Sequence, residues 1–264
     1  MHTGSASFRI PWLKLYVFVI LFLLFVPLML IVIFSFNDNL LGVFPLTGFT
    51  LRWYQDILSG RLYIDGFKNS AIVASFSAIG SGVLGTLGAY GLNRYRWRLK
   101  GPALGFLTLP ILIPGLVLGI ALLSYFTFTG VKLSLGTVIL AHIVFSTPYV
   151  ALIMNSRFHN FDWAIEEAAR DLGANALERF RYVLFPLIRP SMIGAMLLVF
   201  AISFDEFIVT YFVIGAQSTM PMIIWSMLRR GISPVLNSIS TILLLLSFTL
   251  LFIALRVLKV KFEF

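Results

Sequence analysis

Residues 160–190 read NFDWAIEEAARDLGANALERFRYVLFPLIRP and carry the signals that decide the fold. Asp162 is a favourable N-cap for a first short helix. Gly173 can adopt the left-handed conformation that commonly ends a helix. Asn175 and Glu178 have the spacing of a capping box at the start of a second helix. The stretch is therefore predicted to form two short helices that are joined by a sharp turn.

Both short helices are predicted to be amphipathic. Apolar residues recur at helical spacing: Ile165, Ala168, Ala169 and Leu172 in the first helix, and Leu177, Phe180 and Leu184 in the second. Pro186 is predicted to end the second helix. Such apolar faces are stable only when they are buried. They therefore pack either on the chain's own helix ends or on another protein.

Long apolar runs flank this loop on both sides. A helix needs about 20 apolar residues to cross a bilayer, and six stretches reach this length: about 13–36, 69–92, 102–125, 134–154, 191–214 and 236–258. Apolar residues make up 59% of the 264 residues and charged residues 12%, with no Cys. This composition excludes a disordered chain, a secreted disulfide scaffold and a water-soluble enzyme. The predicted fold is an all-α membrane protein, a single domain over residues 1–264 with a cytoplasmic loop at 155–190.

The Lys and Arg residues predict the orientation in the membrane. The net charge is +9, and 14 of the 20 basic residues fall on one side when the predicted loops are alternated. The side richer in Lys and Arg is normally cytoplasmic, so both termini are predicted to lie inside. A nucleic-acid partner would need one contiguous basic face with interleaved aromatic residues. The basic balance instead reports topology, and no nucleic-acid partner is expected.

Two predicted spans carry further structural signals. The span 69–92 has small residues at four-residue spacing, in rows that let helix backbones approach closely. These rows are Ser77, Ser81, Gly85 and Ala89, and Ala74, Ala78, Gly82 and Thr86. We therefore expect this span to be central in a helix bundle. In the span 102–125, Pro110 and Pro114 remove backbone donors and are expected to kink the helix.

The loop also contains a motif with fixed spacing. Glu167, Ala168 and Ala169 are followed after three residues by Gly173, and nine residues later by Val183–Pro186, which reads Val-Leu-Phe-Pro. This pattern resembles the signature of permease subunits in binding-protein-dependent ABC importers, Glu-Ala-Ala, three residues, Gly, nine residues, Ile-x-Leu-Pro. Val and Phe here replace Ile and Leu and keep their apolar character. The position between the fourth and fifth predicted spans also matches the family.

The resemblance implies a type I ABC importer permease fold in the bacterial inner membrane. It implies contact with an ATPase subunit through Glu166, Glu167, Ala168, Ala169, Asp171 and Gly173. It also implies a second permease subunit, two ATP-binding subunits and an external solute-binding protein as partners. The chain lacks the Gly-x4-Gly-Lys-Ser/Thr phosphate loop. ATP and Mg²⁺ are therefore expected on the partner subunits, and the chain itself is expected to be a transport subunit without cofactor, metal or catalytic residues.

The predicted spans contain two acidic residues, Asp205 and Glu206. At 1.5 Å per residue they would lie about 21 Å from the inner end of a continuous helix, where a charge has to face protein or water. Glu206 would share a helix face with Ser203 and Thr210, which favours a water-filled cavity. Together with Tyr211, these residues are predicted to line a substrate pathway. The alternative is a structural pair between spans, with His142 or Asn69 as partner.

Several stretches also resemble the spermidine/putrescine permease branch of the family. They are Leu51–Tyr54, Ala141–Pro148, Asp171–Ala174, Ser203–Phe207 and Leu228–Pro234. Carboxylates beside aromatic rings suit an organic polycation, because charge pairing and cation–π contact act together. A polyamine is therefore the expected substrate. Branches for opines, thiamine, iron or phosphonates share parts of these motifs, and the external receptor sets most of the selectivity.

Two functions of other classes remain as alternatives. A stand-alone secondary transporter would need ion-coupling residues within its spans, where Asp205, Glu206 and His142 are available. Transport that persists without an ATPase would favour it. An intramembrane enzyme would need a Ser/His dyad or a metal-ligand cluster, and no such arrangement stands out in the sequence.

Overall fold

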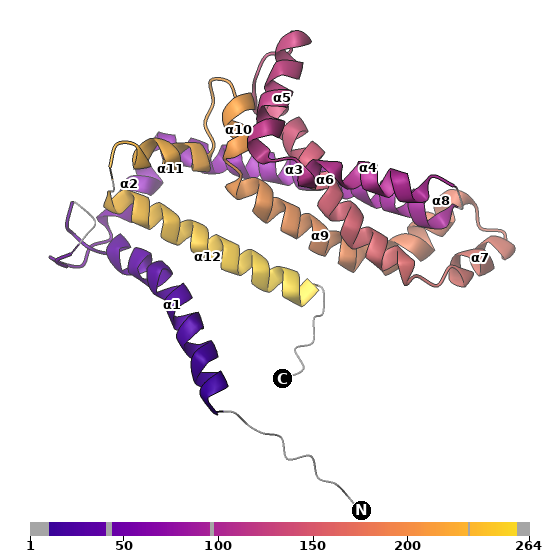
Figure 1. Cartoon of the computed structure of the whole chain (residues 1–264), viewed down its shortest axis with the longest axis horizontal. Coiled ribbons are helices and arrows are strands. Elements are labelled where there is room, and N and C mark those ends of the chain that lie inside the picture. Colours follow the sequence, from indigo (N-terminus) through magenta and orange to yellow (C-terminus); the bar gives the residue numbers. More distant parts are fainter. Residues whose placement is uncertain (1–10, 41–43, 96–97, 232, 258–264) are drawn as a thin grey trace, which may run out of the picture. The chain divides into compact units, whose positions relative to one another are not determined.

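The computed structural model describes residues 11–40, 44–95, 98–231 and 233–257 (Figure 1). This part of the chain is helical apart from connecting segments and one isolated antiparallel bridge, between Asn37 and Phe49. Its helices are α1 (Pro11–Ser35), α2 (Arg52–Ser59), α3 (Arg61–Arg94), α4 (Lys100–Leu112), α5 (Gly115–Phe128), α6 (Leu135–His159), α7 (Ala164–Asp171), α8 (Ala176–Glu178), a π-helical segment η1 (Arg179–Leu184), α9 (Phe185–Asp205), α10 (Ile208–Val213), α11 (Met220–Leu228) and α12 (Pro234–Val257). The all-α prediction is confirmed.

The described residues fall into two compact units. One combines the chain up to Ser59 with Met227–Leu245, and the other combines Gly60–Ser226 with the described residues from Leu246 onward. In the larger unit α3 packs against α6 and α9, and these long helices run alongside one another (Figure 1). The short helix α10 packs against α5. The candidate site residues lie in this larger unit.

The small residues of α3 let this helix pack closely, as predicted. All eight members of the two rows are buried. A Cβ atom added at Gly85 would lie 2.7 Å from Cβ of Val150 and 2.9 Å from the backbone nitrogen of Ala151. Only glycine permits the α3 and α6 backbones to approach this closely at that point. The central position predicted for α3 is confirmed.

The predicted membrane spans are recovered in part. Among the described residues, four helices are long and apolar enough to cross a membrane: α1, α3, α6 and the continuous helix Ala176–Asp205. The helices α4 and α5 would form a fifth span as one bent pair, since they meet at 99°. Pro110 lies inside α4 and Pro114 is the N-cap of α5. The kink predicted from these prolines is confirmed, and it is sharp enough to divide the predicted span 102–125 into two helices.

Six spans are not confirmed. The fifth predicted span, 191–214, is interrupted, because α9 ends at Asp205. The sixth predicted span, 236–258, coincides largely with α12, which has 24 residues. Residues 1–10 and 258–264, which carry the termini predicted to be cytoplasmic, lie outside the described residues.

The second loop helix continues directly into α9. Residues Ala176–Asp205 form one 30-residue helix, with a π turn at Arg179–Leu184 in which the N–H of Phe185 donates to the carbonyl oxygen of Phe180. The prediction that Pro186 ends this helix is wrong, because Pro186 lies in the first turn of α9. The wider π turn before it changes the hydrogen-bond register, so the missing N–H of proline is accommodated without a break.

Candidate functional site

The turn between α7 and α8 is built around Gly173. This residue has a φ of +90°, which side chains other than glycine rarely adopt. Its N–H donates to the carbonyl oxygen of Arg170 at 2.9 Å, and the N–H of Ala174 donates to that of Ala169 at 3.1 Å. These two bonds close the end of α7 as a Schellman motif. The predicted left-handed turn is therefore confirmed.

The predicted capping box of the second loop helix is present, whereas the N-cap of α7 is Trp163 and not Asp162 as predicted. The N–H of Glu178 donates to Oδ1 of Asn175 at 3.0 Å, and the N–H of Asn175 donates to Oε2 of Glu178 at 2.8 Å. This reciprocal pair is the predicted capping box. At the start of the loop, Oδ1 of Asp162 accepts from the N–H of Ala164 at 3.0 Å. The backbone of the whole loop is thus fixed by its own short-range contacts.

The loop presents an apolar surface that the chain itself does not cover. Leu172, Leu177 and Tyr182 are 89%, 71% and 70% exposed. By contrast, Leu184 is buried in the hydrophobic core of the larger unit, to which the loop belongs. The apolar faces predicted for the loop helices are therefore divided between the chain's own core and the surface.

The six residues predicted to contact an ATPase do not share one environment. Glu167, Ala168, Asp171 and Gly173 are exposed, and Ala169 is half-buried. Glu166 is only 4% exposed. Its carboxylate lies 2.9 Å from Nε of Arg94 and 3.5 Å from Nε of Arg179. The side chain of Glu166 thus faces its own chain.

Asp205 and Glu206 lie at a break between α9 and α10, and not within one continuous helix as predicted. Asp205 is the last residue of α9, and Glu206 has an extended backbone with ψ 122°. The Glu206 carboxylate accepts from the N–H of Val209 at 2.9 Å and from the N–H of Thr210 at 3.0 Å. These donors are unpaired backbone groups at the start of α10. Glu206 therefore caps the next helix.

His142 of α6 connects the two sides of this break. Its Nδ1 lies 2.6 Å from Oγ of Ser203, and its Nε2 lies 2.9 Å from Oγ1 of Thr210 and 3.5 Å from Oε2 of Glu206. His142, Ser203 and Thr210 are all buried. The predicted polar stripe thus exists, but Ser203 and Thr210 bond His142 between helices and do not face an open cavity. Asn69, the other suggested partner, donates instead to the carbonyl oxygen of Ser218 at 2.9 Å.

The remaining two predicted pathway residues are exposed. Asp205 has no hydrogen bond or ion pair within the part of the chain that the structure describes. Tyr211 is half-exposed, and its ring packs 5.7 Å from that of Phe207, which in turn lies 5.1 Å from Trp225. An unpaired carboxylate and an aromatic group therefore occur close together in sequence at the helix break.

A cavity of about 300 Å³ adjoins this break. It is lined by Pro110, Ile111, Ile113, Pro114, Gly115, Leu118, Phe145, Tyr149, Glu206 and Val209. The bend between α4 and α5 forms one wall, and Glu206 supplies a carboxylate to a lining that is otherwise largely apolar. Across the described residues, no three His, Asp or Glu side chains are grouped so that they could hold a metal ion.

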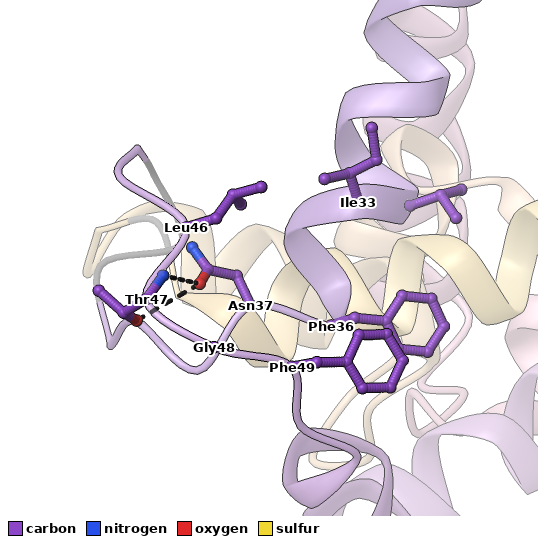
Figure 2. Close-up of a pocket in the computed structure, with 8 residues that line it drawn as sticks. Ile33, Phe36, Asn37, Leu46, Thr47, Gly48 and Phe49 are labelled. Atoms are coloured by element: carbon purple, nitrogen blue, oxygen red, sulfur yellow. Dashed lines mark hydrogen bonds between the residues drawn. The ribbon is translucent and has the colours of Figure 1, made fainter.

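The smaller unit contains a separate hollow of about 460 Å³ at the end of α1 (Figure 2). It is lined by Val32, Ile33, Phe36, Asn37, Leu46, Thr47, Gly48 and Phe49. The rings of Phe36 and Phe49 stack 5.0 Å apart, and Oδ1 of Asn37 accepts from the N–H of Thr47 at 3.1 Å. Trp53 supports this loop by donating to the carbonyl oxygen of Asn37 at 2.8 Å. The lining has no charged group, so it offers no site for a polycation.

Comparison with known proteins identifies clear relatives of the chain. Residues 81–262 match the family described as "binding-protein-dependent transport system inner membrane component". The chain is 34% identical over 236 residues to the spermidine/putrescine transport system permease protein PotC of Haemophilus influenzae. The matched region covers 89% of this chain and 91% of that protein. It is 33% identical over 244 residues to the putrescine transport system permease protein PotI of Escherichia coli K12, with coverage of 89% and 86%.

Two solved structures resemble the chain in fold. One is a chain of the MetNI methionine ABC transporter in an inward-facing conformation, with a TM-score of 0.64 and 19% identity over 75% of this chain and 95% of that chain. The other belongs to a bacterial ABC transporter that imports the acidic polysaccharide alginate, with a TM-score of 0.72 and 16% identity over 100% of both chains. At these identities the likeness concerns the fold alone.

Proposed function

The chain belongs to the family of binding-protein-dependent transport system inner membrane components, and from this premise we propose that it is a permease subunit of an ABC importer for polyamines. The family resemblance first seen in the loop motif is confirmed, and the fold is that of ABC importer permeases. The chain is therefore a multi-pass membrane transport subunit and not an enzyme. Such permeases work with a binding protein, an ATPase and a second permease.

The identity to permeases named for spermidine and putrescine carries the polyamine proposal. It reaches about one third over nearly nine tenths of the chain, with 34% identity to PotC and 33% to PotI. We place the subunit in a bacterial inner membrane with two ATP-binding subunits and an external polyamine receptor. ATP and Mg²⁺ bind on the partner subunits in this proposal. The absence of a Gly-x4-Gly-Lys-Ser/Thr phosphate loop from this chain supports the binding of ATP by other subunits.

The exposed face of the α7–α8 loop is the proposed contact with the ATPase. Leu172 and Leu177 are apolar and exposed, while Glu167 and Asp171 supply charge beside them. Burying such a mixed surface on a partner gains hydrophobic free energy and fixes the register through the charged groups. The closing of the ATPase subunits would then move this loop, and the loop would carry the movement into α9 without an intervening break.

Asp205 is the proposed contact for a substrate ammonium group. Its carboxylate is exposed and has no described ion partner, whereas Glu206 already accepts two backbone hydrogen bonds. Tyr211 and Phe207 supply aromatic surface close by in sequence. An ammonium group gains from both a carboxylate and a ring face. In alternating access, the substrate shifts the equilibrium only if these contacts differ between inward and outward states.

Reconstitution of the complete importer tests this function. The chain, its partner permease, the ATPase and the receptor are placed in liposomes, and uptake of labelled spermidine and putrescine is measured. We expect uptake to require ATP and receptor, and to be blocked by unlabelled polyamine but not by thiamine, an opine, a phosphonate or ferric iron. Preference for one of those other solutes would reject the polyamine assignment. Uptake by the chain without an ATPase would instead identify a secondary transporter.

A further inference from the structure

A buried ion cluster joins the start of the α7–α8 loop to two other elements. Glu166 of α7 is 4% exposed, and its two carboxylate oxygens face different arginines. Oε2 lies 2.9 Å from Nε of Arg94, the last residue of α3, and Oε1 lies 3.5 Å from Nε of Arg179, the first residue of the π turn. One carboxylate therefore links the loop both to the central helix and to the helix that continues into α9.

Further contacts hold both arginines in place. Arg94 reaches Oε1 of Glu167 with Nη1 at 3.6 Å and lies over the ring of Trp163 at 5.5 Å. Arg179 donates from Nη1 to the carbonyl oxygen of Ala174 at 3.0 Å. The contact between Nε of Arg94 and Oε2 of Glu166 is an ion pair without hydrogen-bond geometry, and the other contacts hold both arginine side chains in place. The cluster of Glu166, Arg94 and Arg179 is thus a preorganised contact between elements and not an isolated surface ion pair.

Aromatic rings form an apolar support around this cluster. The ring of Trp163 lies 6.0 Å from Tyr90 of α3, 5.9 Å from Phe158 of α6 and 4.9 Å from Phe161. Phe158 is fully buried. A cavity of about 240 Å³ lies beside these rings and is lined in part by Tyr90, Glu166 and Arg179. A buried charge such as that of Glu166 depends strongly on its partners. A change at Glu166 therefore disturbs the link between elements more than the exposed surface of the loop.

We propose that Glu166 is a positioning residue that transmits movement of the loop to α3 and α9 through Arg94 and Arg179, and that it does not itself touch the ATPase. This inference rests on the proposed function, because it assumes that the loop is driven by an ATPase. It assigns different tasks to the two adjacent acidic residues. Glu166 connects the loop to its own chain, and Glu167 remains exposed for the partner.

The test compares Glu166→Gln with Glu178→Gln in the complete importer. Both variants remove one negative charge from the same loop, but Glu178 is exposed and glutamine can retain its capping box. We expect Glu166→Gln to keep the ATPase bound during purification while the amount of spermidine taken up per ATP hydrolysed falls about tenfold. Glu178→Gln should keep both properties. Loss of the ATPase from the Glu166→Gln complex, or an unchanged transport-to-hydrolysis ratio, would overturn the proposal.

A double variant and a milder one make the test independent of folding losses. If Glu166 and Arg94 act as one unit, Glu166→Gln combined with Arg94→Gln should reduce the ratio no further than the more severe single variant. Multiplicative losses would contradict a shared role.

Arg94→Lys keeps the charge but cannot reach Glu166 and Glu167 with a planar fork. It should insert normally and lower the ratio about threefold, and a normal ratio in this variant would also reject the proposal. Inactivity of the unaltered importer would refute the proposed function instead.

Discussion

Asp205 and Glu206 are adjacent in the sequence but have different surroundings in the structure. Glu206 accepts backbone hydrogen bonds at the start of α10 and lies 3.5 Å from His142. Asp205 is exposed, with no ion partner in the described residues. A carboxylate that already accepts hydrogen bonds from its own chain has fewer acceptor sites left for a substrate. The two residues should therefore respond differently to the same loss of charge.

Substitution by the corresponding amide separates these roles. We expect Asp205→Asn to lower spermidine uptake by at least fivefold, about 1 kcal/mol, with normal protein levels and thermal stability, because it removes an exposed cation contact. Glu206→Gln places an NH₂ group against backbone N–H donors and should destabilise the protein by about 1–3 kcal/mol. Uptake normalised to protein level and the unfolding temperature in detergent are measured for each variant. Asp56→Asn on α2 serves as the control, and equal uptake losses in it and Asp205→Asn would contradict the assignment.

The conformation of Gly173 makes a graded prediction. No atom lies within 4 Å of a Cβ built at this position, so a substitution there is opposed by the φ of +90° alone. Asn tolerates left-handed φ better than Val, and strain of this kind costs about 1–3 kcal/mol. Uptake per ATP hydrolysed should therefore fall in the order Gly, Asn, Val, while the amount of protein in the membrane stays constant. Normal coupling by Gly173→Val at a normal protein level would refute a role for this turn.

At the scale of elements, local signals proved predictable and tertiary breaks did not. Gly173 and the Asn175–Glu178 capping box are encoded within a few residues, and both occur as expected. The break between α9 and α10 is bridged by His142, which is distant in the sequence and contacts Ser203 and Thr210 on its two sides. Pro186 likewise fails as a helix end because the π turn before it changes the hydrogen-bond register. The hydropathy and residue spacing of a single sequence do not predict such long-range or irregular hydrogen bonds.

The packing of α3 against α6 can be tested at Gly85. A methyl group there would meet Cβ of Val150 at 2.7 Å and backbone atoms of Thr147 and Ala151 at 2.9 Å. Backbone cannot yield as a flexible side chain can, so Gly85→Ala should destabilise the protein by about 1–3 kcal/mol. Gly91→Ala in the same helix meets no atom within 4 Å. It should be neutral or slightly stabilising, and equal unfolding temperatures for the two variants would contradict this packing.

At the scale of the whole molecule, the proposed function requires one face of the protein to meet an ATPase and the opposite face to meet a receptor. The distribution of Lys and Arg predicts which face is which, since the predicted alternation of loops would put 14 of 20 on the side of the α7–α8 loop. The basic residues Arg170, Arg179 and Arg181 belong to this loop. The same distribution predicts that α2 lies on the external side. This orientation is independent of the substrate, so it can be tested separately from transport.

Cysteine labelling measures that orientation directly, because the chain contains no Cys that would react in the background. Asp56→Cys on α2 and Glu178→Cys at the start of α8 both replace exposed residues. With a maleimide that cannot cross membranes, we expect Asp56→Cys to react in cells whose outer membrane has been made permeable, and Glu178→Cys to react only in inverted vesicles or after detergent is added. Detergent-treated samples of both variants provide the control for reactivity. Labelling of Glu178→Cys from outside would place the loop away from the cytoplasm, where no ATPase could drive it, and would thereby reject both the orientation and the coupling role.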